Sequence, residues 1–288
     1  MVKAYMPLPK FPSISITGSK CSLKCKFCEG KVLNEMVQIN RPEELLQLLR
    51  HLKRKRRIVG CLISGGFDRK GKLPIKPYLK VLKEAKKELD IIISVHTGIV
   101  CKEYAEKLRD ANIDIVDFNL QDPLTMREIM GLNYSWEEIE NSITVLYDYG
   151  PPYIAPHILI GAYYGRKHKE EKLIDLISKF KPYILVLLSL VNVKGTAFEN
   201  ISPPTPEEVY SIFKYARRKL NCELALGCMR PRGRYSEKLE KILLQEKLVD
   251  RIVLPSCMKN EKLLPFCCSL PEELERKIIS EIDAKNTV

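Results

Sequence analysis

Short apolar runs rich in Ile, Val and Leu alternate along the chain with longer segments in which apolar residues recur at helical spacing. This alternation predicts β–α units arranged around a parallel sheet. Eight runs have the length and composition of buried strands, and they cover residues 13–17, 58–64, 91–96, 113–119, 153–160, 183–190, 222–226 and 251–254. Eight such units predict an α/β fold, a complete (β/α)8 barrel of the TIM type, with its chemistry where strands end and loops begin.

The helical segments carry their own start signals. Ser135 with Glu138, and Thr205 with Glu208, have the spacing of capping boxes, and three prolines fit first helical turns, namely Pro42, Pro206 and Pro271. Residues 120–134 are long for a barrel connection, so we expect either a lid or substrate wall there, or a short extra helix.

The length and hydrophobic content favour a single domain. A chain of 288 residues with 45% hydrophobic residues can bury one large core, so we assign residues 1–288 to one barrel. We expect residues 255–288, which carry cysteines, to close near the barrel mouth. The longest apolar run, residues 183–193, is too short to span a bilayer, and the N-terminus lacks the apolar run of a signal peptide. We therefore expect a cytoplasmic protein that contacts no membrane.

The chain carries a formal charge of +12. This excess is consistent with a solvated surface, or with attraction to an acidic partner such as a carrier protein or RNA. Aromatic residues do not alternate with the basic ones as they do in single-strand binding surfaces, so we favour the acidic protein over nucleic acid.

Three cysteines lie directly after the first predicted strand, in the stretch Cys-Ser-Leu-Lys-Cys-Lys-Phe-Cys. Thiolates at Cys21, Cys25 and Cys28 can bind three irons of a cubane and leave the fourth iron open. A structural zinc site usually has four ligands, and no nearby His or Cys supplies the fourth. Three unrelated buried cysteines are the remaining alternative.

This spacing, with an aromatic residue before the third cysteine, resembles the radical S-adenosylmethionine (SAM) superfamily. The resemblance implies a [4Fe-4S] cluster on Cys21, Cys25 and Cys28, with SAM chelated at the open iron. In that superfamily, reductive cleavage of SAM yields a 5'-deoxyadenosyl radical, and the protein supplies binding and exclusion of water.

The resemblance also implies cofactor contacts at the ends of other strands. Ser64, Gly65 and Gly66 resemble the turn that receives the methionine amino group, although an ordinary tight turn has the same composition. The stretch 157–161 resembles the adenine-contacting segment, to which Phe27 would add backbone contacts. The full set of candidate cofactor residues is Phe27, Ser64, Gly65, Gly66, His96, Asn119, Gln121, His157, Ile160, Gly161 and Arg230.

Parts of the chain resemble biotin synthases, namely residues 191–196 followed by 204–207, and the pair Asn119 and Leu120. Biotin synthases have a carboxylate where this chain has Gln121. They also hold a sulfur-donating [2Fe-2S] cluster on three strand cysteines, and the corresponding positions here are Leu62, Ser94 and Ala155. These departures disfavour biotin synthesis.

The remaining cysteines gather late in the chain. Cys228 ends the seventh predicted strand and Cys257 follows the eighth, with Cys267 and Cys268 shortly after. Neighbouring strands of a barrel would bring these thiols to one mouth, where they could hold a second [4Fe-4S] cluster, unless some are small buried hydrophobes. Arg230 and Arg232 could bind a carboxylate or form a surface pair. We expect packing roles for Cys61, Cys101 and Cys222.

Together these features resemble the archaeal two-protein lipoyl synthases. The resemblance implies sulfur insertion into an octanoyl chain on an acidic carrier protein, a second radical SAM subunit, and a reductant such as ferredoxin. Two alternatives remain open. One is a radical SAM enzyme of another reaction type, biotin synthase-like or rearranging, with a relay cluster. The other is a non-catalytic iron–sulfur or zinc scaffold.

Overall fold

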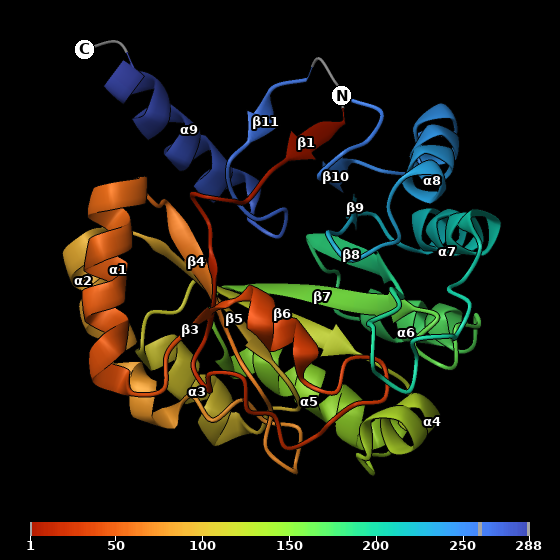
Figure 1. The fold of residues 1–288 in the computed structure, drawn as a ribbon, viewed down its shortest axis with the longest axis horizontal. Helices are drawn as coiled ribbons and strands as arrows, with labels where there is room; N and C mark the ends of the chain where they lie inside the picture. Colours follow the sequence, from red (N-terminus) through yellow and green to blue (C-terminus); the bar gives the residue numbers. More distant parts are fainter. Residues whose placement is uncertain (1, 259–260, 287–288) are drawn as a thin grey trace.

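The computed structural model describes residues 2–258 and 261–286, and its centre is one curved parallel sheet (Figure 1). Every ladder in the sheet is parallel, and the strand order is β11-β1-β10-β9-β8-β7-β6-β5-β4-β2-β3. From β4 to β10, neighbours in the chain are neighbours in the sheet. This is the order that successive β–α units produce.

All eight predicted strands are confirmed, and their ends differ from the prediction by at most two residues. They are β2 (Ser13–Ser15), β4 (Gly60–Ser64), β5 (Ile92–Thr97), β6 (Ile115–Leu120), β7 (Tyr153–Ile160), β8 (Ile184–Ser189), β9 (Glu223–Leu226) and β10 (Arg251–Val253). These strands could be predicted closely because both faces of each are buried, and such strands are continuous runs of β-branched and aliphatic residues.

Three further strands were not predicted, because each has only two or three residues. They are β1 (Lys3–Tyr5), β3 (Val37–Gln38) and β11 (Leu263–Leu264). β1 pairs with β10 at the position that β2 would occupy in a closed barrel, and β11 pairs with β1. Within the described residues no ladder joins β11 to β3, so the predicted α/β barrel is present as an open barrel.

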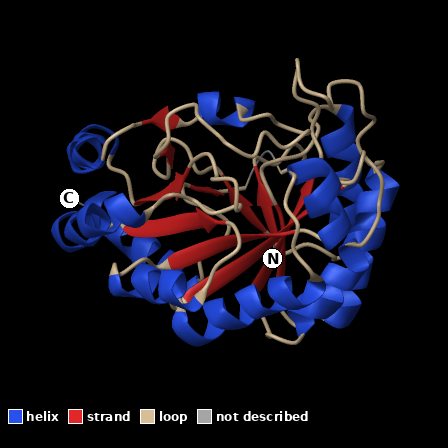
Figure 2. Ribbon diagram, turned by 90° about the horizontal axis from the view of Figure 1, so that it is seen from below, coloured by secondary structure: helices blue, strands red, loops and turns tan. Residues whose placement is uncertain are grey.

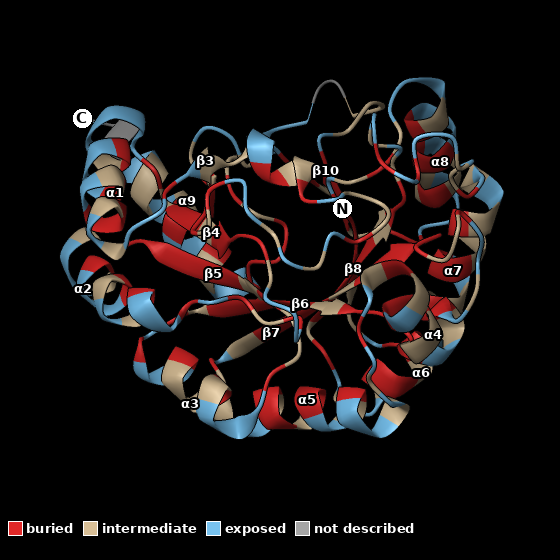
Figure 3. Ribbon diagram, turned by 60° about the horizontal axis from the view of Figure 1, so that its bottom comes forward, coloured by how far each residue is buried: buried red, intermediate tan, exposed pale blue. Residues whose placement is uncertain are grey.

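The helices form an outer layer around the curved sheet (Figure 2). Their buried faces turn toward the strands and their exposed faces toward solvent (Figure 3). They are α1 (Pro42–Arg56), α2 (Leu79–Leu89), α3 (Lys102–Asp110), α4 (Pro123–Thr125), α5 (Trp136–Tyr149), α6 (Glu170–Ser178), α7 (Pro206–Lys219), α8 (Arg234–Gln245) and α9 (Glu272–Asn286), with short turns η1 (Lys31–Glu35), η2 (Lys76–Tyr78) and η3 (Met126–Met130). No described helix is long and apolar enough to cross a bilayer.

Both predicted capping boxes are confirmed. Ser135 Oγ accepts from the Glu138 N–H at 3.2 Å, and the Glu138 carboxylate accepts from the Ser135 N–H at 2.8 Å. Thr205 and Glu208 repeat this exchange at the start of α7. The long connection after β6 contains α4 and the π-helical turn η3, which confirms the alternative of a short extra helix.

Helix α9 closes the barrel at the end opposite to the predicted one. The Glu275 carboxylate on α9 accepts from Lys3 Nζ at 2.8 Å, from Tyr5 Oη at 2.6 Å and from Arg251 at 2.8 Å. Lys3 and Arg251 are the first residues of their strands, so α9 lies under the amino-terminal ends of β1 and β10. The prediction that the whole of residues 255–288 closes near the mouth is therefore wrong. The helix plugs the bottom because its apolar face joins Ile278, Leu274 and Ile282 to the interior core.

The interior of the barrel changes character along its axis. Its lower part is apolar and packed with Ile115, Ala155 and Ile184 beside residues of the C-terminal segment. Toward the carboxyl ends of the strands the inward-facing residues become polar and keep accessible surface, as His96 and His157 do. An open and polar upper interior next to the strand ends is the position that the barrel rule assigns to chemistry.

Candidate functional site

The loop that follows β2 folds its three cysteines toward one another. The N–H groups of Cys28 and Glu29 donate to the Cys25 carbonyl at 3.0 and 2.8 Å, and the Lys31 N–H donates to the Cys28 carbonyl at 2.8 Å. The interaction between the side chains of Cys25 and Cys28 raises the pKa of Cys25 and lowers that of Cys28. The pKa of Cys25 is raised further by burial and by Cys21, so all three sulfurs share one electrostatic environment.

Neighbouring loops hold this cysteine loop in place. The Ser22 N–H donates to the Phe67 carbonyl after β4 at 2.9 Å, and the Lys26 N–H donates to the Ile129 carbonyl in η3 at 2.9 Å. Lys31 Nζ donates to the carbonyls of Lys194 and Gly195 after β8, at 2.9 and 2.6 Å. Three different strand ends therefore fix the position of the thiols.

The turn formed by Ser64, Gly65 and Gly66 packs directly against the cysteine loop. A Cβ atom on Gly66 would lie 1.9 Å from the Lys20 carbonyl oxygen and 2.5 Å from the Cys21 Cα, so no other residue fits there. Gly65 has φ +156°, and Ser64 Oγ lies 3.2 Å from His96 Nδ1. The structure thus places Ser64, Gly65, Gly66 and His96 beside the cysteine loop, and their contacts with SAM stay a prediction.

Polar side chains on β5, β6 and β7 line the upper interior. His157 Nδ1 donates to the Ala155 carbonyl at 2.9 Å, because a carbonyl oxygen only accepts, and neutral His157 therefore carries its lone pair on Nε2. Burial, followed by the neighbouring His157, lowers the pKa of His96. Asn119 interacts with His96, and Asn119 and Gln121 line a small cavity of about 30 Å³ that also reaches Leu23 of the cysteine loop.

The segment after β7 forms a second turn near the cysteine loop. Gly161 has φ +81°, and its N–H donates to Glu170 Oε1 at 3.0 Å. Ile160 is buried in the core between sheet and helices, so its side chain faces away from the interior. Phe27 packs in one apolar group with residues of η3, of this turn and of the β8–α7 loop, namely Ile129, Met130, Tyr163, Tyr164, Leu190, Phe198 and Ile201.

A family model described as the radical SAM superfamily matches residues 15–180, more than half of the 288 residues. The chain belongs to the radical SAM superfamily. The matched stretch runs from β2 to α6 and includes both glycine turns and all three cysteines of the loop. A search of curated proteins found no match.

Solved structures share the fold of this radical SAM chain. Methylornithine synthase (PylB) is 15% identical with a TM-score of 0.57, and the alignment covers 96% of this chain and 82% of that one. The FeFe-hydrogenase maturase HydG from Carboxydothermus hydrogenoformans is 17% identical with a TM-score of 0.61, covering 97% and 67%. SuiB from Streptococcus suis bound to SAM is 19% identical with a TM-score of 0.55, covering 76% and 51%.

The donor set of the cysteine loop fits the [4Fe-4S] cluster and SAM that the superfamily implies. Among the described residues no three His, Cys, Asp or Glu side chains are arranged to hold a single metal ion. A cubane takes one thiolate per iron and so requires wider thiol spacing than one ion does. The loop supplies three thiolates, one for each of three irons, and the fourth iron of such a cubane would stay open to a ligand.

Arg230 has a structural role in place of the predicted cofactor contact. Its guanidinium is buried and donates to Ser236 Oγ, to the carbonyls of Gly227, Val253 and Leu254, and to the Glu240 carboxylate. These bonds use all five donors of an arginine, so none remains for a carboxylate of SAM. Arg232 is exposed and donates to the carbonyls of Cys228 and Leu254.

Three of the four late cysteines influence one another's pKa values. The pKa of Cys268 is raised by a hydrogen bond with Cys267, by burial and by Cys228, and the pKa of Cys267 is lowered by the same bond. Cys228 has exposed surface, yet desolvation by the surrounding protein is the main influence that raises the pKa of its thiol. Cys228 lies directly after β9, at the carboxyl edge of the sheet.

The fourth late cysteine, Cys257, lies elsewhere. Its thiol donates to the Glu237 carbonyl at 3.5 Å, and its backbone N–H donates to the Glu240 carboxylate at 2.9 Å, which places it against α8. The sequence grouped it with the others because it follows β10, but the turn after β10 carries it outward. Cys61 is buried among helix-facing residues and Cys222 packs against that core, as predicted, whereas Cys101 is exposed at the start of α3.

Two residues that the sequence analysis missed shape the site. The buried Glu170 carboxylate accepts from the N–H groups of Gly161 and His168, at 3.0 and 2.6 Å, and so fixes the turn after β7. Asp117 is buried in the interior, where Ser94 Oγ donates to one carboxylate oxygen and the other has no hydrogen-bond partner in the described residues. For Asp117, the sequence signal for a role in the site was a carboxylate inside a predicted buried strand. Glu170 gave no such signal, because an acidic residue in the first turn of a helix is ordinary.

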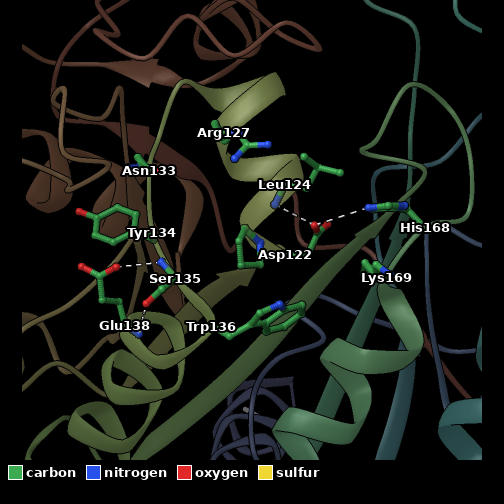
Figure 4. A pocket seen from close by; sticks show the side chains of 11 residues that line it. Asp122, Leu124, Arg127, Asn133, Tyr134, Ser135, Trp136, Glu138, His168 and Lys169 are labelled. Carbon is green, nitrogen blue, oxygen red and sulfur yellow. Dashed lines mark hydrogen bonds and ion pairs between the residues drawn. The ribbon is translucent and has the colours of Figure 1, made fainter.

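A larger pocket of about 380 Å³ lies outside the barrel interior, between the β6–α5 connection and the start of α6 (Figure 4). Asp122 stands at its centre with its carboxylate 3.7 Å from His168 Nε2. Trp136, Tyr134 and Leu124 supply apolar surface, and Arg127 and Lys169 lie on opposite sides. This pocket contains none of the predicted site residues.

Proposed function

We propose that this radical SAM protein inserts sulfur into an octanoyl chain carried on a lysine of an acidic protein, and that it shares this work with a second radical SAM subunit. The observation that carries the proposal is that Cys268 is buried in the interior core with Cys267 packed against it, while Cys228 follows β9, all apart from the cysteine loop. Thiols in this arrangement could hold a second iron–sulfur cluster whose sulfide is the sulfur substrate.

The interior positions support sulfur insertion over biotin synthesis. Leu62 and Ala155 belong to the interior core, and Ser94 donates to Asp117, so the three places at which biotin synthases carry cysteines face the interior without a thiol. A sulfur-donating cluster on those strands has no ligands here. The C-terminal segment provides two thiols instead, and Arg251 fixes their backbone by donating to the carbonyls of Cys268 and Leu270 at 2.7 and 2.6 Å.

The roles of the chain's own residues follow from their places. Cys21, Cys25 and Cys28 would hold the first cluster, and the glycine turn at Gly66 would let the methionine part of SAM approach it. Phe27 and the turn at Gly161 would border the adenine. Bound there, the cluster and SAM supply a 5'-deoxyadenosyl radical that removes a hydrogen atom from the substrate. The packed lower interior and α9 exclude water from below, which protects a radical from side reactions.

The test is anaerobic turnover of an octanoyl-lysyl peptide by protein whose late cluster was assembled with isotopically labelled sulfide. The proposal predicts labelled sulfur in the product and 5'-deoxyadenosine in proportion to the carbon–sulfur bonds formed. Labelled clusters that yield 5'-deoxyadenosine with an unlabelled or sulfur-free product would show that the sulfide is not the donor.

A second candidate is a radical SAM reaction on a polar substrate, with the late cysteines holding a relay cluster. The polar upper interior, with His96, Asn119, His157 and the carboxylate of Asp117, favours it over an aliphatic chain. The same turnover assay separates the two candidates. A polar substrate would be converted without sulfur, and the octanoyl peptide would be left unchanged.

A further inference from the structure

The pocket outside the barrel interior has the size of a small-molecule site. Its volume of about 380 Å³ falls within the range of about 300–1,000 Å³ that is usual for ligand pockets. It lies between the connection after β6 and the start of α6 (Figure 4). None of the residues expected to hold a cluster or SAM lines it, so it is distinct from the cofactor site.

One segment separates this pocket from the upper interior. Leu124 on α4 and Arg127 on η3 line the pocket. Met126 and Met130 on η3 line the small cavity that also contains Asn119. Opposite faces of the α4–η3 segment therefore border the two cavities. An occupant of the pocket would lie behind this wall, apart from a substrate in the interior.

Two aromatic side chains line the pocket. Tyr134 is fixed by its hydroxyl, which donates to the Lys70 carbonyl at 2.7 Å. Trp136 is half-buried, and Lys172 Nζ lies 4.2 Å from the centre of its ring. Aromatic side chains with accessible ring surface stack on flat rings, including nucleobases, because every base has a π-face. This side of the pocket therefore fits a flat ring.

Asp122 stands at the centre of the pocket and can accept one more hydrogen bond (Figure 4). Its Oδ1 accepts from the N–H groups of Leu124 and Thr125 at 3.0 and 3.2 Å, and its Oδ2 accepts from Thr125 Oγ1. A carboxylate offers about four lone-pair positions, so one on Oδ2 is free. His168 does not fill it, because its Nε2 lies 3.7 Å from Oδ1 and has no hydrogen bond within the described residues. The centre of the pocket therefore fits a ligand with a hydrogen-bond donor.

Two basic side chains stand on opposite sides of the pocket without a close acidic partner (Figure 4). Lys169 Nζ has no ion pair or hydrogen bond in the described part of the chain, and Arg127 approaches Glu128 Oε1 only to 3.9 Å. Glu138, the other acid of the lining, is engaged in the capping box of α5. Lysine and arginine both bind phosphate oxygens, so the rim of the pocket can hold a phosphate.

We propose that this pocket binds a nucleoside monophosphate whose base carries an exocyclic amino group. The base would stack on Trp136 and donate from its amino group to Asp122 Oδ2, and the phosphate would bind Arg127 or Lys169 at the rim. A free phosphate would leave the aromatic side and Asp122 unused, whereas a neutral nucleoside would leave the cations unused. The inference goes beyond sulfur insertion and does not depend on which reaction the radical performs.

The test uses tryptophan fluorescence, because Trp136 is the only tryptophan of the chain. Cluster-loaded protein with saturating SAM is titrated with CMP, with UMP, which has a carbonyl in place of the amino group, and with cytidine, which lacks the phosphate. We expect CMP to change the emission saturably and to bind about tenfold more tightly than UMP or cytidine. Added salt should reduce the advantage over cytidine, because screening weakens the phosphate contact.

Variants assign the signal to the named groups. R127Q/K169Q should bind CMP about as weakly as the wild type binds cytidine. The matched control R54Q/K55Q removes the same charge from exposed residues at the end of α1, and it should change the Kd for CMP by less than about twofold. Asp122→Asn should reverse the preference between CMP and UMP, because an amide can donate to the uracil carbonyl that a carboxylate repels.

An emission that does not change saturably at millimolar CMP would overturn the proposal, as would equal affinities of the wild type for CMP and UMP. Loss of the CMP signal on addition of SAM would assign the binding to the cofactor site instead. Inorganic phosphate that binds as tightly as CMP would show a simple anion site and no nucleotide pocket. If Asp122→Asn does not fold, the comparison of CMP with UMP on the wild type still decides, since it requires no substitution.

Discussion

The two cysteine groups of this chain are built in different ways. Cys21, Cys25 and Cys28 lie within eight residues, so the local turns of one loop bring them together, and neighbouring loops then hold that loop in place. Cys228 and the pair Cys267–Cys268 come from a strand end and a C-terminal segment that are almost forty residues apart. The first group is specified by spacing, and the second by topology.

The second group also depends on a buried ion-pair network. Arg251 is fully buried and donates to the Cys268 carbonyl, to Glu275 and to Glu223, while Tyr5 donates to the same Glu275. The cysteine loop has no comparable ion-pair network among the described residues. It is fixed by backbone hydrogen bonds to Phe67 and Ile129 and by the Lys31 side chain, which donates to two carbonyls after β8. We therefore expect a mutation that damages one cysteine group to have little effect on the other.

The largest expected effect is at the cysteine loop. Cys25→Ala should lower SAM cleavage by at least about a thousandfold and remove about four irons per chain, because a cubane with an open iron requires all three thiolates. Cys257→Ala is the comparison, since its thiol donates to the Glu237 carbonyl on α8. It should retain both activity and iron. Loss of iron in the Cys257 variant would place that residue in a cluster and break the contrast.

The next effect is on the C-terminal segment. Arg251→Met should lower the free energy of unfolding by about 3–5 kcal/mol, because it removes the one fully buried cation that pairs with the Glu275 carboxylate and leaves it with Tyr5 and the partly exposed Lys3. Urea denaturation measures this loss. Cys267 should become reactive toward a thiol reagent at urea concentrations at which Cys25 stays protected. Equal exposure of both thiols would show that the two groups unfold as one unit.

Gly66→Ala should have a smaller effect on stability, about 1–3 kcal/mol, because its Cβ would overlap the Lys20 carbonyl. The strain falls on the cysteine loop, so we expect weaker SAM binding as well, measured by equilibrium dialysis. Gly131→Ala is the matched control. Gly131 also has a positive φ, of +72°, but no atom of the described residues lies within 4 Å of the place that a Cβ would take, so SAM binding should not change.

The smallest effect concerns pH. The pKa of His96 is lowered by burial and by His157, so above about pH 6.5 the residue is neutral in both the folded and unfolded states. As the pH falls below this value, the unfolded chain takes up a proton that the folded chain resists, and stability declines by at most about 1.4 kcal/mol per pH unit. His96→Gln should flatten this decline in denaturation curves between about pH 6.5 and 5. An unchanged slope would mean that another group causes it.

The sequence predicted the parts of the fold that local pattern controls. Eight strands appeared as apolar runs because both of their faces are buried, and the spacing of Cys21, Cys25 and Cys28 was sufficient to predict the loop. It did not predict β1, since three residues have no periodicity, and β1 is the strand that occupies the place where the barrel would close. Pairing between strands that are far apart in the sequence decides where a short strand such as β1 forms.

The errors at the site have the same origin. Arg230 has the composition of an anion-binding residue, but five hydrogen bonds to distant carbonyls, Ser236 and Glu240 engage it. Cys257 follows a strand end, as Cys228 does, yet the following turn directs it to α8. The position of α9 beneath the barrel depends on Glu275 meeting Arg251 and Tyr5, which no local pattern reveals.

The central claim is that two separate cysteine groups hold two clusters. The most direct test is Mössbauer spectroscopy with iron and sulfide quantification on anaerobically reconstituted wild type and on C21A/C25A/C28A. The account predicts two [4Fe-4S] clusters in the wild type and one in the triple variant, held by the late cysteines. A wild type with a single cluster that the triple variant loses would contradict the second site and remove the basis for sulfur insertion.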